Sequence, residues 1–366
     1  MENKRIVIDA RESGTSTGRY IDKLVENLHR LKPAHEMVVL AKAQRLEYLR
    51  SVAPGFTVLE APYQEFTFDE QLGFKKRLDG LKADLVHFGM TQQPVRYKGA
   101  AVTTVHDLTT LRFENPAKNR AIFKLKQKAY KYVVKKAAQK SKAIITPSQF
   151  VKDDLIQFTG ISPDKVTVTH EAAEPIQSPA APLPDLQNKQ FIMYIGRPTP
   201  HKNLKRLIEA FALLRAQHPA LTLVLAGKKD SNYQRIEANL SAGLRPHVVF
   251  TDFVSDGQLR WLYEHCAAYV FPSLSEGFGL PGLEAMAHGA PVVSSNATCL
   301  PEVYGPAAHY FDPLDIQAMA DAINEVLSDE TLCKRLTADG KQQVAKYSWR
   351  RMAEQTLAVY LAVLSS

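Results

Sequence analysis

Short apolar runs alternate with amphipathic stretches along the first half of the chain. The runs have the length and composition of buried strands, whereas the stretches between them repeat apolar residues at helical spacing. The predicted strands cover residues 6–9, 37–40, 56–60, 85–88, 101–105, 143–146 and 166–169. Buried strands that alternate with helices are typical of a parallel sheet with crossover helices.

A proline-rich segment interrupts this pattern at residues 175–189. Its four prolines stand among small and polar residues, which excludes a helix or a central strand. The alternation then restarts, with predicted strands at residues 191–195, 221–226, 248–250, 268–271, 291–294 and 308–311. The pattern therefore predicts an α/β protein with two Rossmann-like domains and a cleft between them, and ligands beyond the carboxyl ends of the strands.

The domain bounds follow from that interruption. The chain has 366 residues, roughly twice the usual size of one domain. We expect an N-terminal domain over residues 1–174, a linker over 175–189 and a C-terminal domain over 190–346. Residues 347–366 are predicted to form a last helix, which follows a complete second domain.

Composition narrows the class of protein. The chain is 45% hydrophobic and 23% charged, which excludes a disordered or fibrous protein. It has neither an apolar run of ~20 residues for a membrane span nor an apolar stretch suited to a signal peptide. The three cysteines have no paired spacing, so we expect neither a disulfide framework nor a zinc site. The simplest expectation is a cytoplasmic protein.

The net charge of +8 is concentrated in one segment. Residues 118–142 contain ten lysines and arginines and no acidic residue, with apolar residues at helical spacing. This basic amphipathic helix has two interpretations: a solvated face of a helix packed on a sheet, or a patch that faces anionic lipid. We do not expect a nucleic-acid partner.

A glycine-rich turn follows the predicted strand at residues 268–271. Gly277 and Gly279 lack a Cβ, so the backbone N–H groups near them can approach a ligand closely. Pro281 suits a helix start, where its missing N–H costs nothing, and Gly289 suits a helix end. A free helix N-terminus behind such a turn attracts phosphate and other oxygen-rich ligands.

Two carboxylates bracket this turn. Glu276 lies on the turn and Glu284 in the expected first helical turn, so both can face one ligand. Carboxylates accept paired hydrogen bonds from sugar or ribose hydroxyls. The plainer alternative is a solvated loop residue and a glutamate that favours a helix N-terminus.

A second candidate loop, residues 196–203, comes directly after the strand at 191–195. After Gly196, Arg197 could grip diphosphate oxygens with its planar fork, and Lys202 could add a point charge. The alternative is a surface loop in which Asn203 caps the next helix.

The first domain offers weaker signals. Gly14, Gly18 and Arg19 belong to a glycine-rich loop that opens a helix, but this loop is not the dinucleotide fingerprint. His106 follows the strand at 101–105, which puts it at the carboxyl edge of the sheet. A lone histidine is more often structural, but its place at a strand end favours a function.

Together these residues resemble glycosyltransferase family 4, retaining transferases of GT-B fold, and above all its bacterial mannosyltransferase-like members. Glu276 to Glu284 fits the family's E-x7-E pattern, and residues 196–203 are similar to its donor-phosphate motif. The remaining matches are Gly18-Arg-Tyr20, His106-Asp107, Ile145-Thr-Pro-Ser148 and Tyr347-Ser-Trp349. The chain differs from the family at Gly282, where a larger residue is common, and in its longer loop at residues 14–18.

The resemblance implies a role for each matching position. Glu276 would contact hydroxyls of the transferred sugar, and Glu284 the ribose. Arg197 and Lys202 would hold the diphosphate, and His106 would bond the sugar from the opposite domain. The last helix would cross back to the N-terminal domain. The backbone amides that would approach the sugar and β-phosphate are those of Gly277, Phe278, Gly279 and Leu280.

No Asp-x-Asp pair follows a strand in the manner of a divalent-metal site, so we expect neither a metal nor another cofactor. No carboxylate is clearly placed as a nucleophile, which favours front-face transfer with retention. The resemblance favours GDP-mannose as the donor, before a UDP-hexose. The expected acceptor is a glycan or lipid-linked intermediate of cell-envelope polysaccharide synthesis, and a soluble acceptor remains open.

Two other classes of protein were weighed against the transferase. An oxidoreductase or epimerase would need a tight G-x-G-x-x-G and an acidic residue about 20 positions later, and neither is found. A non-catalytic sugar-nucleotide-binding protein or peripheral membrane scaffold remains the alternative.

Overall fold

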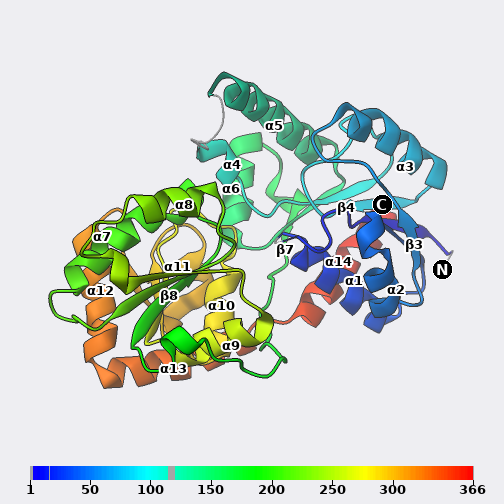
Figure 1. The fold of residues 1–366 in the computed structure, drawn as a ribbon. Helices are drawn as coiled ribbons and strands as arrows, with labels where there is room; N and C mark the ends of the chain where they lie inside the picture. Colours follow the sequence, from blue (N-terminus) through cyan, green and yellow to red (C-terminus); the bar gives the residue numbers. More distant parts are fainter. Residues whose placement is uncertain (1–2, 16, 114–119, 366) are drawn as a thin grey trace. The chain divides into compact units, whose positions relative to one another are not determined.

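The computed structural model describes residues 3–15, 17–113 and 120–365, with only the backbone described for residues 120–125. It forms two compact units, each around one parallel sheet (Figure 1). Unit 1 comprises the chain up to Arg112, the segment that ends at Glu171 and the residues from Ser348. Unit 2 runs from Ala172 to Tyr347 and also includes Phe113.

The sheet of unit 1 has seven parallel strands in the order β3-β2-β1-β4-β5-β6-β7. The strand order reverses between β1 and β4, which is where open α/β sheets bind ligands. The strands are β1 (Arg5–Asp9), β2 (Glu36–Ala41), β3 (Thr57–Glu60), β4 (Leu85–Phe88), β5 (Ala101–Thr104), β6 (Ala143–Thr146) and β7 (Val166–Val168).

The helices of unit 1 are α1 (Arg19–Leu31), α2 (Leu46–Val52), α3 (Lys75–Leu81), α4 (Thr109–Arg112), α5 (Arg120–Lys140), α6 (Gln149–Thr159) and α14 (Trp349–Leu364). A π-helical turn at Glu70–Phe74 precedes α3. Helix α6 shows why such segments are helical. The Ser148 hydroxyl accepts a hydrogen bond from the Val151 N–H at its start, and Gly160 ends it in the left-handed conformation.

The sheet of unit 2 has six parallel strands in the order β10-β9-β8-β11-β12-β13 and reverses between β8 and β11. The strands are β8 (Phe191–Ile195), β9 (Thr222–Ala226), β10 (Val248–Asp252), β11 (Ala268–Phe271), β12 (Val292–Ser295) and β13 (Ala308–Phe311). The helices are α7 (Leu204–Leu214), α8 (Ser231–Ala238), α9 (Asp256–His265), α10 (Leu280–Ala287), α11 (Leu300–Tyr304), α12 (Ile316–Ser328) and α13 (Glu330–Ala345).

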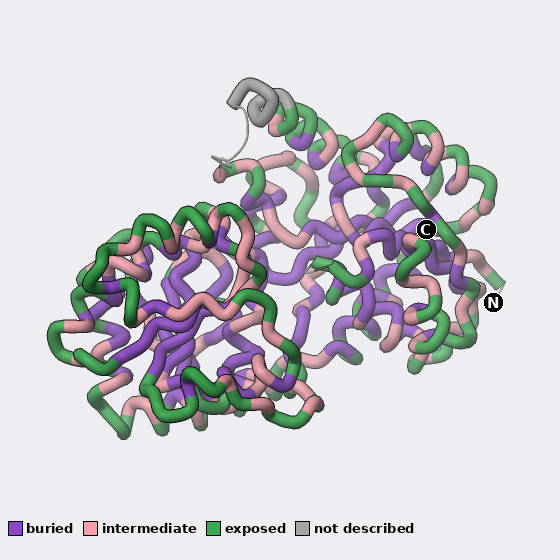
Figure 2. Tube along the Cα trace, viewed as in Figure 1, coloured by how far each residue is buried: buried purple, intermediate pink, exposed green. Residues whose placement is uncertain are grey.

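Burial follows the strands in both units. The central strands of each sheet are buried along their length, while the outer faces of the helices are exposed (Figure 2). This is expected of sheets that are covered by helices on both faces. The predicted fold class, two Rossmann-like α/β domains, is confirmed.

The last helix, α14, belongs to unit 1 and packs against α1 and β4. Its Tyr360 hydroxyl lies 2.5 Å from Nδ1 of the fully buried His87 on β4. The Ser348 hydroxyl caps the helix by accepting from the Arg351 N–H. The C-terminal residues are therefore part of the core of the first unit.

The basic helix expected at residues 118–142 is α5, which ends at Lys140. Residues 118 and 119 lie outside the described part of the chain. The described side chains of α5 alternate between buried and exposed positions, with Tyr130 and Val134 facing the core. One face of α5 therefore packs on unit 1, as the first interpretation requires.

Candidate active site

The glycine-rich turn lies at the carboxyl end of β11, beside the point where the strand order of unit 2 reverses. Neighbouring loops hold it in place. The Glu276 N–H donates to the Thr298 hydroxyl at 3.1 Å, and the Cys299 thiol donates to the Glu276 carbonyl at 3.3 Å. The turn therefore has a fixed shape before any ligand arrives.

Helix α10 starts directly behind this turn. Gly279 precedes it with a φ of 91°, a conformation that favours glycine. Pro281 is the second residue of α10, where its missing N–H still costs nothing. Glu284 lies in the second turn of α10, so its expected place in the first turn is wrong by one turn.

The departure from the family at Gly282 has a structural reason. The Tyr304 hydroxyl donates a 2.5 Å hydrogen bond to the Gly279 carbonyl, and its ring lies against Gly282. A Cβ at position 282 would overlap the Tyr304 ring. Tyr304 thus fills the space of a larger side chain and fixes the start of α10 from outside the turn.

The two candidate loops of unit 2 are joined by hydrogen bonds. The Asn203 amide nitrogen donates to the carbonyls of Pro272, at 3.1 Å, and Pro313, at 2.8 Å. The Leu274 N–H donates to the His201 carbonyl at 2.7 Å. Asn203 stands at the N-cap position of α7, as the alternative expected, but its side chain makes no capping hydrogen bond. Its side chain connects residues 196–203 to the turn after β11.

Lys202 and Glu276 meet where these loops join. The Lys202 ammonium lies 2.5 Å from a carboxylate oxygen of Glu276, and both side chains keep some exposure. Arg197 is exposed and has no ion pair within the described residues. The two cations outnumber the one carboxylate on these loops, which suits an anionic ligand.

Gly196 and Glu284 also have defined surroundings. Gly196 has a φ of 145°, and its carbonyl accepts from the Tyr233 hydroxyl at 2.8 Å. Glu284 is buried and accepts from the Tyr263 hydroxyl at 3.3 Å. Neither tyrosine had a signal in the sequence, because each comes from a helix with no motif.

In unit 1, His106 lies two residues beyond β5, as predicted, and its side chain is 17% exposed. Its Nδ1 lies 3.1 Å from a Glu171 oxygen, and its Nε2 lies 3.0 Å from the Gly89 carbonyl. The Tyr20 ring packs edge-on against the imidazole at 4.8 Å. Sequence reasoning missed Glu171, which follows β7 and is buried.

The second histidine of this region, His87, is neutral. Its two ring nitrogens lie 2.5 Å from the Tyr360 hydroxyl and 2.8 Å from the Thr104 hydroxyl, each of which can donate or accept. Burial lowers the pKa of His87 to about 3. The hydroxyl of Tyr20 lies 3.0 Å from that of Thr104, which joins α1 to the same network.

In the glycine-rich loop of unit 1, two backbone N–H groups already donate hydrogen bonds to other groups of the protein. The Gly14 N–H donates to Asp22 at 3.2 Å, and the Gly18 N–H donates to the Thr15 carbonyl and hydroxyl. Arg19 begins α1 and is exposed. Two amides of the expected phosphate loop are therefore already occupied, and its role in binding an acceptor or phosphate stays a prediction.

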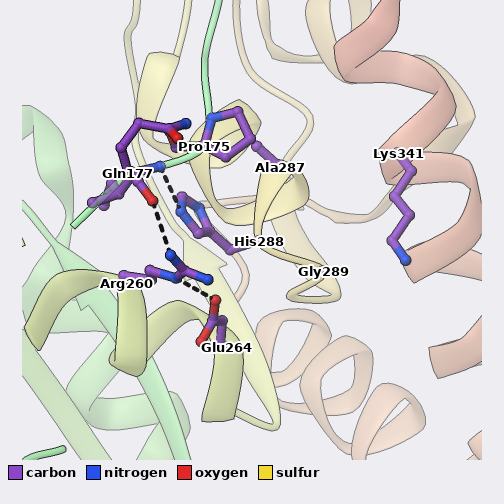
Figure 3. Close-up of a pocket in the computed structure, with 9 residues that line it drawn as sticks. Pro175, Gln177, Arg260, Glu264, Ala287, His288, Gly289 and Lys341 are labelled. Atoms are coloured by element: carbon purple, nitrogen blue, oxygen red, sulfur yellow. Dashed lines mark hydrogen bonds and ion pairs between the residues drawn. The ribbon is translucent and has the colours of Figure 1, made fainter. Parts of the chain in front are cut away.

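A hollow of about 410 Å³ lies at the other end of α10, between α9, α13 and the linker (Figure 3). His288 accepts a hydrogen bond from the Ile176 N–H at 2.9 Å and donates one to the Glu284 carbonyl at 2.7 Å. Eight helical residues, about 12 Å, separate this hollow from Gly279. It is therefore distinct from the candidate ligand loops.

Comparison with known proteins agrees with this geometry. Residues 17–175 match the family described as Glycosyltransferase Family 4, and residues 181–343 match Glycosyl transferases group 1. O-antigen chain mannosyltransferase B of Escherichia coli is 34% identical over 71% of this chain and 70% of its own length. The chain is a member of glycosyltransferase family 4. It is therefore a glycosyltransferase, and the relative's name agrees with the predicted hexosyltransferase class.

Other relatives of this family 4 enzyme extend the comparison. The serotype-specific mannosyltransferase WbdA of Escherichia coli is 36% identical over 62% of this chain, which spans 30% of the WbdA length. The sucrose-phosphate synthase structure from Thermosynechococcus elongatus has a TM-score of 0.80 at 18% identity and covers 99% of this chain and 100% of its own. Anabaena HepE, in complex with UDP and glucose, has a TM-score of 0.74 at 18% identity, over 98% and 100%. These structures confirm the GT-B fold.

Proposed function

We propose that this enzyme transfers mannose from GDP-mannose to a glycan or lipid-linked acceptor of cell-envelope polysaccharide synthesis, with retention and without a metal ion or cofactor. The observation that supports this most directly is the convergence of Lys202, Glu276 and the N-terminus of α10 at one edge of the sheet. The names of the mannosyltransferase relatives favour mannose. The UDP and glucose bound by HepE make a UDP-hexose the second candidate.

In this proposal unit 2 holds the donor. Arg197, Lys202 and the backbone amides of Gly277 to Leu280 stabilise the charge that develops on the diphosphate as it leaves. Glu276 accepts from hydroxyls of the sugar while it orients the Lys202 ammonium. Glu284, oriented by Tyr263, accepts from the ribose.

The chemistry proceeds on one face of the sugar. The bond from C1 to the β-phosphate oxygen breaks, the acceptor oxygen bonds C1 on the same face, and its proton passes to the leaving phosphate. No carboxylate of the protein is then needed as a nucleophile. Among the described residues, no group of three or more histidine, cysteine or acidic side chains is arranged to hold a metal ion.

A thermal-shift screen with GDP, UDP, GDP-mannose and UDP-glucose tests the choice of donor. A ligand that binds only the folded state raises its melting temperature, so GDP and GDP-mannose should give the largest shifts. NMR of the product should show the anomeric configuration of the donor. A larger shift with the uridine nucleotides would overturn the donor, and an inverted product would overturn retention.

We further propose that the enzyme works at the cytoplasmic face of an anionic membrane, through α5 and the loop before α3. The side chains of Phe66 and Phe68 on that loop, and of Leu72 on the π-helical turn that follows it, are 69%, 89% and 64% exposed. The rings of Phe66 and Tyr130 lie 6.4 Å apart, which brings the loop beside α5. Among the described side chains of α5, the exposed lysines are Lys126, Lys128, Lys131, Lys135 and Lys136.

Exposed aromatic residues beside a basic helix suit an interface with anionic lipid. No described helix is both long and apolar enough to cross a bilayer. Alanine at Lys128, Lys131 and Lys135, with Phe68→Ser, should abolish binding to vesicles that contain phosphatidylglycerol at low salt. Alanine at Lys205, Lys334 and Lys341 of unit 2 removes the same charge and should leave binding unchanged. Equal binding by both variants would contradict the proposal.

A further inference from the structure

Both ring nitrogens of His106 face oxygen atoms that only accept hydrogen bonds. Nδ1 lies 3.1 Å from a carboxylate oxygen of Glu171, and Nε2 lies 3.0 Å from the carbonyl oxygen of Gly89. A neutral imidazole has one N–H and one lone pair, so one of these contacts would bring two lone pairs together. The imidazolium form donates to both oxygens.

The groups around the ring support the charged form. Burial lowers the pKa of His106, but the hydrogen bond and the charge of Glu171 raise it, with help from the Gly89 carbonyl and Asp107, and the net direction is upward. The remaining neighbours are the Tyr20 ring and His87, which is neutral. Glu171 is 5% exposed, so solvent screens its charge weakly.

We propose that Glu171 is a positioning residue that keeps His106 as an imidazolium at neutral pH, so that His106 presents a positive charge to the substrate. This inference rests on the proposed transferase function. An imidazolium has no lone pair, so His106 is not the base that takes the proton of the acceptor hydroxyl. That proton passes to the leaving phosphate, as the front-face mechanism requires.

The protonation of His106 should depend on the negative charge of Glu171, and not only on its ability to accept a hydrogen bond. Glu171→Gln keeps an oxygen that accepts from Nδ1, but it removes the negative charge that opposes the effect of burial. His106 in that variant should be neutral at pH 7.5. Glu171→Asp keeps the charge on a shorter side chain and should restore part of the effect.

Nitrogen-15 NMR of the histidine-labelled full chain tests the protonation state without any substrate. The His106 signals are assigned as those lost in His106→Gln. In the unaltered enzyme both ring nitrogens should have imidazolium shifts at pH 7.5. In Glu171→Gln the titration midpoint should fall by about one pH unit or more, since loss of the charge leaves burial dominant. Glu47→Gln, an exposed change on α2, is the matched control and should leave the midpoint unchanged.

Activity provides the second readout. At one pH unit above the new midpoint, the protonated fraction and kcat/KM of Glu171→Gln should be about tenfold lower, and both should recover as the pH falls. A neutral His106 in the unaltered enzyme, or the same midpoint in Glu171→Gln, overturns the inference. The NMR result holds even if the transferase proposal fails, and failure of both NMR predictions leaves that proposal intact. If Glu171→Gln does not fold, the NMR titration of His106 in the unaltered enzyme and in Glu171→Asp tests the inference.

Discussion

Charged side chains at the carboxyl edges of the two sheets differ in their exposure to solvent. At the edge of unit 2, Arg197 is exposed and the Lys202–Glu276 pair keeps contact with solvent. At the edge of unit 1, Arg11 is buried between Asp9 and Glu70, at 2.8 and 3.1 Å. The Lys202–Glu276 pair can be reached by a ligand, whereas Arg11 is enclosed by its partners and serves the fold. Substitution of Lys202 should therefore affect activity first, and substitution of Arg11 stability first.

The largest expected effect is on the stability of unit 1. Arg11→Met leaves Asp9 and Glu70 buried without their cation, which should lower the free energy of unfolding by about 3–5 kcal/mol. Urea unfolding measures this in a Trp261→Phe background, where Trp349 on α14 is the one tryptophan left and reports on unit 1. A loss below 1 kcal/mol would show that the cluster adds little to the fold.

Lys202→Ala should instead lower activity and leave stability almost unchanged. Removing a group that stabilises the leaving diphosphate should lower kcat by about 10²–10³-fold, with little change in the unfolding of unit 2. Steady-state kinetics with the donor measures this, and Trp261 in a Trp349→Phe background reports on unit 2. Lys205→Ala removes an exposed lysine nearby and is the matched control. Equal activity of the two variants would remove Lys202 from the mechanism.

Gly282→Ala tests the support that Tyr304 gives to α10. The added Cβ meets the Tyr304 ring, and overpacking of this kind costs about 1–3 kcal/mol. The melting temperature of the protein and its affinity for the donor should both decrease. Gly80→Ala, on α3 with no atom within 4 Å of the added Cβ, should instead stabilise unit 1 slightly. A neutral Gly282→Ala would mean that Tyr304 moves aside at no cost.

The smallest effect is a pH dependence of opposite sign at two histidines, His288 in unit 2 and His106 in unit 1. Burial lowers the pKa of His288, with opposing effects from Glu264 and Arg260, so its part in the stability of unit 2 is lost as pH falls below 6.5. The pKa of His106 is raised, so its part in unit 1 is complete below 6.5 and lost as pH rises through the folded value. Each part is measured against a substitution in the background that reports its unit, His288→Gln with Trp261 and His106→Gln with Trp349, because the buried His87 adds its own pH dependence to unit 1.

Local pattern predicted most of what positions the glycine-rich turn of unit 2. Strand β11 and the glycines behind it follow from periodicity and from the backbone freedom of Gly279, and the helix expected to start at Pro281 begins one residue earlier, at Leu280. Pro291, which lacks an N–H, was placed inside a strand that starts at Val292. Helices α2, α3, α4, α8 and α11 were not predicted, because they are too short for a clear helical period.

The partners of the site residues could not be predicted, because they come from distant parts of the chain. Glu171 is 65 positions from His106, and Tyr304 is 25 positions from Gly279. Neither residue stands in a motif, so only the fold brings them to the site. Asn203 looked like a helix cap because it precedes α7, but its side chain bonds carbonyls 69 and 110 positions away.

The central claim is that Lys202, Arg197 and the start of α10 receive the diphosphate without an ion. Isothermal titration of the EDTA-treated enzyme with GDP and UDP tests it most directly. We predict that at least one nucleotide binds in EDTA, that added magnesium or manganese leaves its affinity unchanged, and that Lys202→Ala weakens it. Binding of either nucleotide only after a divalent metal is restored would contradict the account.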